Sequence, residues 1–97
     1  MNTEALLEER GKTHGKFRDH ARATMALKSA FAQCCVDESG RGGATSKLSD
    51  VQREAVHMIL HKLGRIAAGD PNFADHWDDI AGYAKLVSQD LERNKLG

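Results

Sequence analysis

Apolar residues recur along this chain at alternating spacings of three and four, which is the period of α-helices rather than of strands. The pattern predicts long helices over about 16–35, over about 50–68 and from Asn72 or Phe73 onward. Their expected core-facing stripes are Phe17, Ala21, Thr24, Leu27, Lys28, Phe31 and Cys35 in the first, Val51, Ala55, Met58, Ile59, Leu63 and Ile66 in the second, and Trp77, Ile80, Ala81, Ala84, Val87 and Leu91 in the third.

Residues that commonly begin and end helices fall at these boundaries. Ser49 and Gln52 have the spacing of a capping box, and Gly69 is a typical helix stop. Near the N-terminus, Thr3 is expected to cap a short helix that Gly11 ends. Since no segment alternates with the period of a strand, the predicted fold class is all-α: a compact helical bundle of three main helices plus a short N-terminal helix.

A stretch rich in Gly and Ser, over 36–47, separates the first two long helices. Its composition predicts a flexible connector. It is not interpreted as a phosphate loop, because the Walker spacing is absent. The whole chain, 1–97, is therefore predicted to be a single helical domain, whose tail after Glu92 should fray.

Composition and charge limit the classes of function. Hydrophobic residues make up 40% of the chain and aromatic residues 5%, so the core should be thin and a homo-oligomer is expected. Lys and Arg (14) balance Asp and Glu (14), which argues against general nucleic-acid binding because that needs excess positive charge. No apolar run is long enough for a membrane span.

The expected location is the cytoplasm, which would be the host cell's cytoplasm if a phage encodes the protein. The N-terminus carries Glu4 where a signal peptide would carry basic residues, and no apolar stretch follows. Cys34 and Cys35 are adjacent on a predicted helix, where side chains point about 100° apart. Reduced thiols, typical of an intracellular protein, are therefore expected.

The helix over 50–68 carries a polar stripe beside its apolar one, formed by Asp50, Glu54, His57, His61 and Arg65. His57 and His61 are four apart, a spacing at which two imidazoles can share one metal ion. No Glu lies between them, which argues against a metalloprotease of the zincin type. The alternative interpretation is a solvated polar face. His14 and His20 are expected to be structural hydrogen-bonding residues.

Cations near these stripes suggest an anion site. Lys62 and Arg65 could clamp a phosphate, Arg65 in bidentate geometry and Lys62 as a point charge. The alternative is that both simply favour the negative end of the helix dipole. Lys28 lies within an apolar stripe, so either its stem packs while its ammonium reaches water, or it points at an anion.

Acids gather on the last helix. Asp75 and Asp79 are four apart on one face, with Asp78 nearby, and like charges at this spacing repel. The cluster is expected to attract a cation, either Mg²⁺ or a basic side chain. Gly82 leaves room on this face for a ligand or a close helix.

Five blocks of sequence, at 7–17, 52–55, 61–66, 69–72 and 75–84, carry a family resemblance. The most specific is Asp75-x-Trp77-x-Asp79-Ile80-Ala81-Gly82-Tyr83. Over nearly the whole chain outside the Gly-rich loop and the tail, they resemble an uncharacterised family of small phage and prophage proteins. The resemblance implies a phage origin and assigns no activity.

A more distant similarity is to the all-α nucleotide pyrophosphohydrolases of the MazG and dimeric dUTPase type. In that family, Glu-x-x-Glu on one helix and Glu-x-x-Asp on the next bind Mg²⁺. Here the first motif is at best Glu54-x-x-His57, and the second is Asp75-x-x-Asp78 or Asp75 with Asp79. Imidazole is a poor Mg²⁺ ligand, so the similarity extends to the fold better than to catalysis.

Three functions are expected from these features, and binding without catalysis is preferred. The first is a binder of a nucleotide or other phosphorylated small ligand, in a charged cleft between the last two helices, that sequesters a host nucleotide signal as an anti-defence protein; its ligand residues would be Lys62, Arg65, Tyr83 and Lys28. The second is a Mg²⁺-dependent nucleotide pyrophosphohydrolase with the metal held by Glu54, Asp75 and Asp79. The third is a protein inhibitor of a host enzyme.

Overall fold

The computed structural model describes residues 2–36, 40 and 47–96, and this part of the chain forms four helices. They are α1 (Thr3–His14), α2 (Phe17–Cys34), α3 (Asp50–Ala68) and α4 (Ala74–Leu96). The predicted all-α class, with three main helices and a shorter N-terminal one, is confirmed. The loop expected over 36–47 lies largely outside the described residues. None of the described helices has the length and apolarity that crossing a membrane requires.

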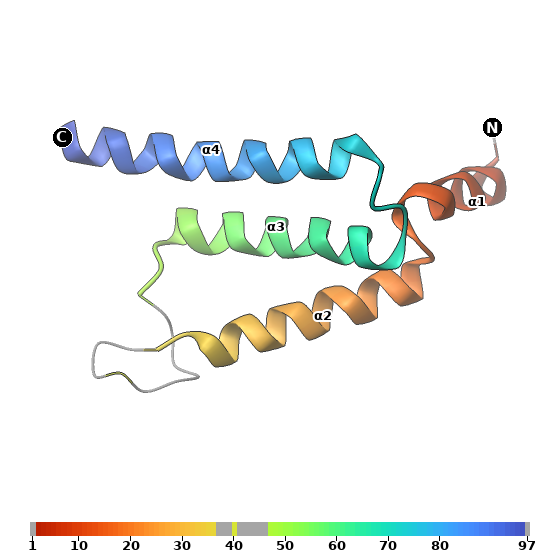
Figure 1. Ribbon diagram of the computed structural model, residues 1–97, viewed down its shortest axis with the longest axis horizontal. Helices are drawn as coiled ribbons and strands as arrows, with labels where there is room; N and C mark the ends of the chain where they lie inside the picture. The colour runs from red at the N-terminus through yellow and green to blue at the C-terminus, as the bar shows by residue number, and fades with distance from the viewer. Residues whose placement is uncertain (1, 37–39, 41–46, 97) are drawn as a thin grey trace.

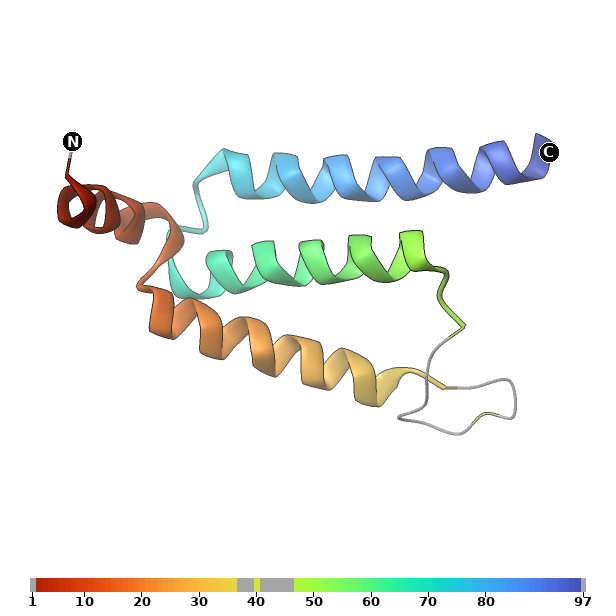
Figure 2. The same ribbon diagram turned by 180° about the vertical axis from the view of Figure 1, so that it is seen from behind.

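The three long helices lie side by side in one layer, with α3 in the middle (Figure 1). Both α2 and α4 run antiparallel to α3 on its opposite sides (Figure 2), and in the described part of the chain they do not contact each other. The α1 helix lies at the end where the α1–α2 and α3–α4 turns meet. The radius of gyration is 16.1 Å, against about 13 Å for a typical domain of this length.

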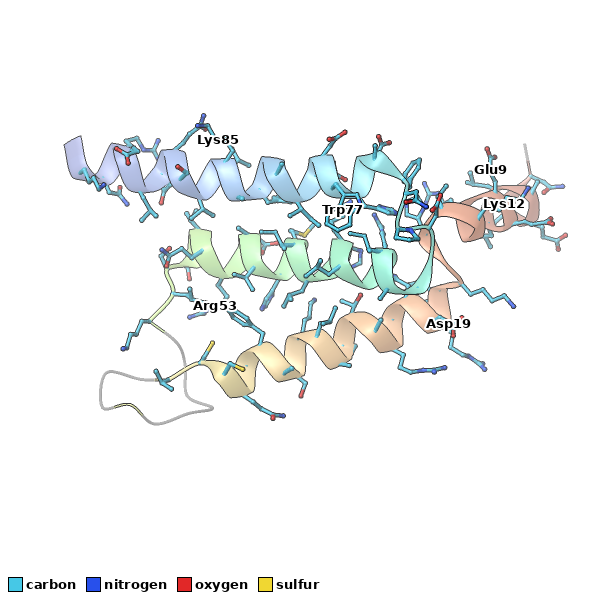
Figure 3. The ribbon with its side chains drawn as sticks, viewed as in Figure 1. Glu9, Lys12, Asp19, Arg53, Trp77 and Lys85 are labelled. Carbon is cyan, nitrogen blue, oxygen red and sulfur yellow. The ribbon has the colours of Figure 1, made fainter. Side chains whose placement is uncertain are left out.

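A single layer has two broad faces. Gly64 of α3 approaches Thr24 of α2, and Lys62 of α3 reaches Asp79 of α4. With about 100° between successive residues, these contacts fix which side chains point toward neither neighbouring helix. The apolar face is the side on which Trp77 lies, toward the viewer in Figures 1 and 3. The helical spacing places Ala23, Leu27, Ala30, Val56, Ile59, Leu63, Ala84 and Leu91 on the same face. The polar face is the opposite side of the layer, toward the viewer in Figure 2. By the same spacing it carries Lys28, Glu54, His57, His61, Arg65 and Asp79.

The core is small because only α3 has long neighbours on both sides. Among the described residues, the buried apolar side chains are Ala55 and Leu60, with 7% and 8% of their surface exposed. Three buried residues are polar: His20, Thr24 and His76. Most other apolar side chains between the helices are only half-buried. The layer therefore excludes water from a narrow seam on each side of α3.

The predicted apolar stripes are partly wrong. Phe17 is 81% exposed, Val51 is 43% exposed, and on α4 Trp77 and Leu91 are 51% and 44% exposed. The side of α4 that faces α3 is instead a stripe of buried and half-buried residues: Phe73, His76, Ile80, Tyr83, Val87 and Asp90. The reason is that a helix with one long neighbour buries about one residue per turn, so the wider apolar stripe stays partly outside the seam.

The structure corrects the expected start and end of α1. The side chain of Asn2, not of Thr3, caps this helix by accepting from the Ala5 amide at 2.7 Å. The helix also continues through Gly11 to His14, because a glycine inside a helix costs only about 1 kcal/mol. At α3, in contrast, the predicted capping box between Ser49 and Gln52 is confirmed.

The α3–α4 turn follows the predicted stop at Gly69, but α4 begins at Ala74, slightly later than expected. Asp70 organises the turn, since its carboxylate accepts from the Asn72 amide at 2.9 Å. The tail that was expected to fray is helical as far as Leu96.

The crossing of α2 and α3 depends on Gly64. A Cβ at this position would overlap Oγ1 of Thr24 and lie 3.2 Å from the Thr24 backbone nitrogen. Thr24 is 4% exposed, and its hydroxyl has no hydrogen-bond partner in the described part of the chain. The missing side chain therefore sets the separation of the two helices, at the cost of a buried hydroxyl.

Gly64→Ala should lower the free energy of unfolding by about 1–3 kcal/mol, because the added methyl group overpacks this crossing. The matched control is Gly82→Ala on the exposed side of α4, where no atom lies within 4 Å of the added Cβ. That control should gain about 0.5–1 kcal/mol from better helix propensity. Urea unfolding followed by circular dichroism measures both, and equal stability of the two variants would contradict the close crossing.

Candidate anion-binding surface

Positive charge gathers at one place on the polar face. Lys28 comes from α2, and His61 and Arg65 come from successive turns of α3; all three side chains are half-buried. The charges of both Lys28 and Arg65 act on the His61 imidazole. The structure thus brings two of the predicted ligand residues, Lys28 and Arg65, to the same imidazole.

His20 of α2 supports this surface from within the α2–α3 seam. Its ring is edge-on to the ring of His61, with centroids 4.5 Å apart. Its Nε2–H donates to the backbone carbonyl of His61, with an N···O distance of 3.3 Å, which sets the tautomer of the neutral ring. His20 is 6% exposed, so it has the structural hydrogen-bonding role that the sequence indicates.

A second histidine pair joins the α1–α2 turn to the start of α4. The rings of His14 and His76 are edge-on at 4.9 Å, and the ring of Phe73 packs against both. The Nε2–H of His76 donates to the Thr13 carbonyl at 3.0 Å, and the Asp70 amide donates to the same carbonyl, also at 3.0 Å. His76 is only 1% exposed, so its imidazole is closed to water.

Burial and Arg65 together keep three of these histidines neutral. Burial is the main reason that the pKa values of His14, His20 and His61 lie below 6.5, and the positive charge of Arg65 lowers each pKa further. For His61 the pKa falls to about 4. In the described part of the chain, the Arg65 guanidinium has neither a hydrogen bond nor an ion pair. An unpaired, half-buried cation beside neutral imidazoles makes this surface a candidate site for an anion.

Lys62, the other half of the predicted clamp, is engaged with the protein itself. Its ammonium lies 2.8 Å from the Asp79 carboxylate, and the Lys62 side chain is only 12% exposed. The hydrogen bond from Lys62 is the main cause that lowers the pKa of Asp79. The acids of α4 were expected to attract a cation, and for Asp79 that cation is Lys62. Arg65 and Lys28 are thus the predicted cations that remain available for a ligand.

The predicted metal ligands are not assembled. Glu54 is exposed on α3, Asp75 is exposed in the first turn of α4, and Asp79 is paired with Lys62. His57 is exposed, while His61 packs against a histidine of α2. Among the described residues, no three His, Cys, Asp or Glu side chains are placed to hold a metal ion. The expected magnesium ion therefore has no preformed donor set in this part of the chain.

Tyr83, the remaining predicted ligand residue, is half-buried on α4. It lines an open hollow together with Asp78, Asp79, Gly82 and Leu86. That hollow is formed by α4 alone, and none of four hollows on the described surface is lined by both α3 and α4. The candidate surface is accordingly an open patch of the polar face rather than the charged cleft expected between α3 and α4.

Sequence reasoning missed His76, although a signal for it was present. His76, Ile80, Tyr83 and Val87 follow the three-and-four spacing of a buried stripe. The predicted stripe contained the adjacent Trp77 instead of His76, because tryptophan is larger and more apolar. The role of His14 at the same junction could not be read from spacing, because α1 and α4 are distant in the sequence.

The comparisons with known proteins add no relative. No protein-family model, no curated protein and no solved structure matches this chain. The candidate surface therefore rests on the residues and their geometry.

The free energy of unfolding should fall as the pH drops from 6.5 to about 4. In this range the unfolded chain protonates histidines that the folded protein keeps neutral, so acid favours unfolding; above pH 6.5 neither state binds these protons and the dependence vanishes. Each histidine contributes a slope of at most about 1.4 kcal/mol per pH unit. Protonation of Asp79, whose pKa is lowered from 3.8, adds to the loss only at still lower pH.

Urea unfolding at a series of pH values measures this slope, and Arg65→Gln is the informative variant. It removes a charge that lowers all three histidine pKa values, so its slope should be shallower than that of the wild type. A stability that is constant across this pH range would contradict the neutral state of the buried histidines.

Proposed function

We propose that the protein binds a phosphorylated small ligand on the polar face, with a phosphate group held by Arg65, Lys28 and His61. The observation that carries this proposal is the unpaired Arg65 guanidinium beside imidazoles whose pKa values it depresses. A phosphate offers a guanidinium two parallel hydrogen bonds, and an ammonium adds a mobile point charge. Both types of cation are present at one location, and they come from two helices.

The ligand would also change the state of His61. Burial is the largest cause of the low pKa of His61 and the charge of Arg65 is the next. A bound phosphate offsets the charge of Arg65, so this pKa rises from about 4. Once protonated, the imidazole becomes a third cationic donor to the phosphate. Binding is in this way coupled to proton uptake by His61.

Tyr83 supports the expectation that the ligand is a nucleotide. Tyr83 lies on the same side of α4 as Asp79, so a base stacked on its ring would extend from the phosphate toward α4. Hydrolysis is not part of the proposal, because the acids needed to hold a magnesium ion are not assembled in the described residues. Sequestration of a host nucleotide signal stays a prediction from the sequence.

Arg65→Gln should weaken binding of a cyclic dinucleotide or of pyrophosphate by about 10- to 100-fold, the loss expected for one charge-assisted phosphate contact. The matched control is Arg22→Gln, an arginine on α2 whose side chain is 76% exposed and paired with Asp19. Its affinity should stay within about twofold of the wild type. Isothermal titration calorimetry measures all three proteins. If the wild type binds none of pyrophosphate, ATP and a cyclic dinucleotide, the proposed function is wrong.

Binding of a cyclic dinucleotide should take up protons near pH 6, since its phosphodiesters keep their charge there while the pKa of His61 rises. The apparent affinity should accordingly increase as the pH falls from about 7.5 to about 5.5. Calorimetry in two buffers of different ionisation enthalpy gives the number of protons directly. A His61→Gln variant should lose this uptake and keep part of the affinity; uptake that persists in this variant would assign the proton to another group.

A further inference from the structure

The chain exposes more surface than a folded monomer of its size. Its accessible surface is 7124 Å², whereas a compact protein of this mass exposes about 5,500 Å². The difference is about 1,600 Å² per chain, and a subunit in an obligate dimer hides about 1,000–2,500 Å². With only Ala55 and Leu60 as buried apolar residues among those described, one layer has little apolar burial to oppose the loss of chain entropy.

Part of this exposed surface lies on the apolar face, which includes Leu91 with 44% of its surface exposed. Trp77 projects there from α4 with 51% of its surface exposed (Figure 3). Its indole N–H donates to the Pro71 carbonyl at 2.7 Å, which holds the ring in one orientation. A large aromatic side chain that is already ordered and half-exposed is the usual centre of a protein interface.

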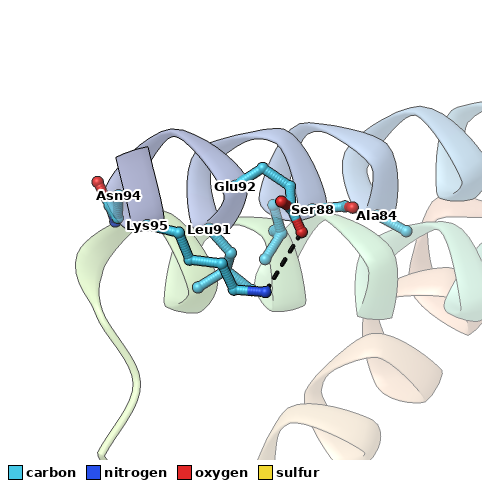
Figure 4. Close-up of a pocket in the computed structure, with 7 residues that line it drawn as sticks. Ala84, Ser88, Leu91, Glu92, Asn94 and Lys95 are labelled. Atoms are coloured by element: carbon cyan, nitrogen blue, oxygen red, sulfur yellow. Dashed lines mark hydrogen bonds and ion pairs between the residues drawn. The ribbon is translucent and has the colours of Figure 1, made fainter. Parts of the chain in front are cut away.

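The same stripe of α4 also offers a complementary recess. An open hollow near the end of the helix is lined by Ala84, Val87, Ser88 and Leu91 (Figure 4). At its rim Lys95 pairs with Glu92 at 3.5 Å, so the hollow carries no net charge from these two residues. The other end of the face has a similar neutral pair, Asp19 with Arg22. A face with a projecting ring, a shallow recess and balanced charges at its rim can pack against a copy of itself.

We infer that a second copy of this chain covers the apolar face, so that two layers pack face to face around a two-fold axis. In such an isologous contact each patch meets the same patch of the partner. Trp77 of one copy then packs on the small and apolar residues of α4 in the other. The half-buried side chains of α3 on this face, such as Ile59 and Leu63, become the core of the dimer.

A second copy fits this face better than an unrelated partner does. The surface that the whole chain exposes beyond a compact monomer is of the size that an obligate dimer hides. The central part of this face is apolar, as the contact regions of homodimers are. The arrangement leaves the polar faces of both copies, with Arg65 and Lys28, on the outside. Self-association is accordingly independent of ligand binding, and either can fail without the other.

The test uses the full chain and its single tryptophan. Light scattering after size exclusion should give twice the 10.6 kDa mass of one chain. Dilution should shift the emission of Trp77 to the red and increase its quenching by acrylamide, as the dimer dissociates. Ala84→Arg should abolish the dimer by placing a charge in the contact, while Gln89→Arg, which adds the same charge at an exposed position on another side of α4, should not.

Each outcome either supports or overturns the inferred dimer. A dimer that Ala84→Arg breaks and Gln89→Arg spares supports the inference. Loss of helicity in Ala84→Arg alone also supports it, provided that Trp77 of the wild type is shielded from acrylamide at high concentration, because folding then depends on association. A monomer at about 100 μM, with Trp77 open to the quencher, overturns the inference and leaves the face for a different protein. A dimer that both variants retain overturns the assignment of the face.

Discussion

All packing between the two outer long helices passes through α3. The α2 helix reaches it where Gly64 meets Thr24, and α4 reaches it along the stripe that contains His76 and Val87. Since α2 and α4 lie on opposite sides and share no contact in the described chain, no third side closes around a common centre. The layered shape, the small core and the two distinct faces are all consequences of this one constraint.

The difference in polarity between the two faces follows from the residues of α3. Its residues that point toward neither neighbour are apolar on one side and polar on the other. Burial, and after it the positive charge of Arg65, disfavours protonation of His14, His20 and His61. The folded state thus keeps an unpaired cation half out of water, which costs stability unless an anion is bound. The proposed ligand would supply the negative charge that balances the unpaired guanidinium of Arg65.

The helices could be predicted from the sequence because spacing and capping are local properties, as the Ser49–Gln52 box shows. Which side of each helix would be buried depended on how many neighbours it has, and no local pattern contains that number. On α4, contact with α3 alone determines that the stripe containing His76 is buried and that the stripe containing Trp77 is not.

The candidate site was predicted in part for similar reasons. Lys62 and Arg65 were recognised from their types and spacing. Pairing of Lys62 with Asp79, and the position of Arg65 near His14, His20 and His61, depend on contacts between distant segments. The expected metal ligands share favourable chemistry, but Glu54 lies near the start of α3, whereas Asp75 and Asp79 lie near the start of the antiparallel α4, where Asp79 meets Lys62.

The Thr13 carbonyl, which accepts from both Asp70 and His76, also has a bearing on how the chain folds. Most helix contacts link neighbours in the sequence, a low-contact-order topology that permits rapid folding. The bond from Thr13 to His76 spans 63 residues, so it closes a much larger loop than any helical hairpin does. We therefore expect the helical hairpins to form early and this closure to come last, in the step that docks α1 and sequesters His76.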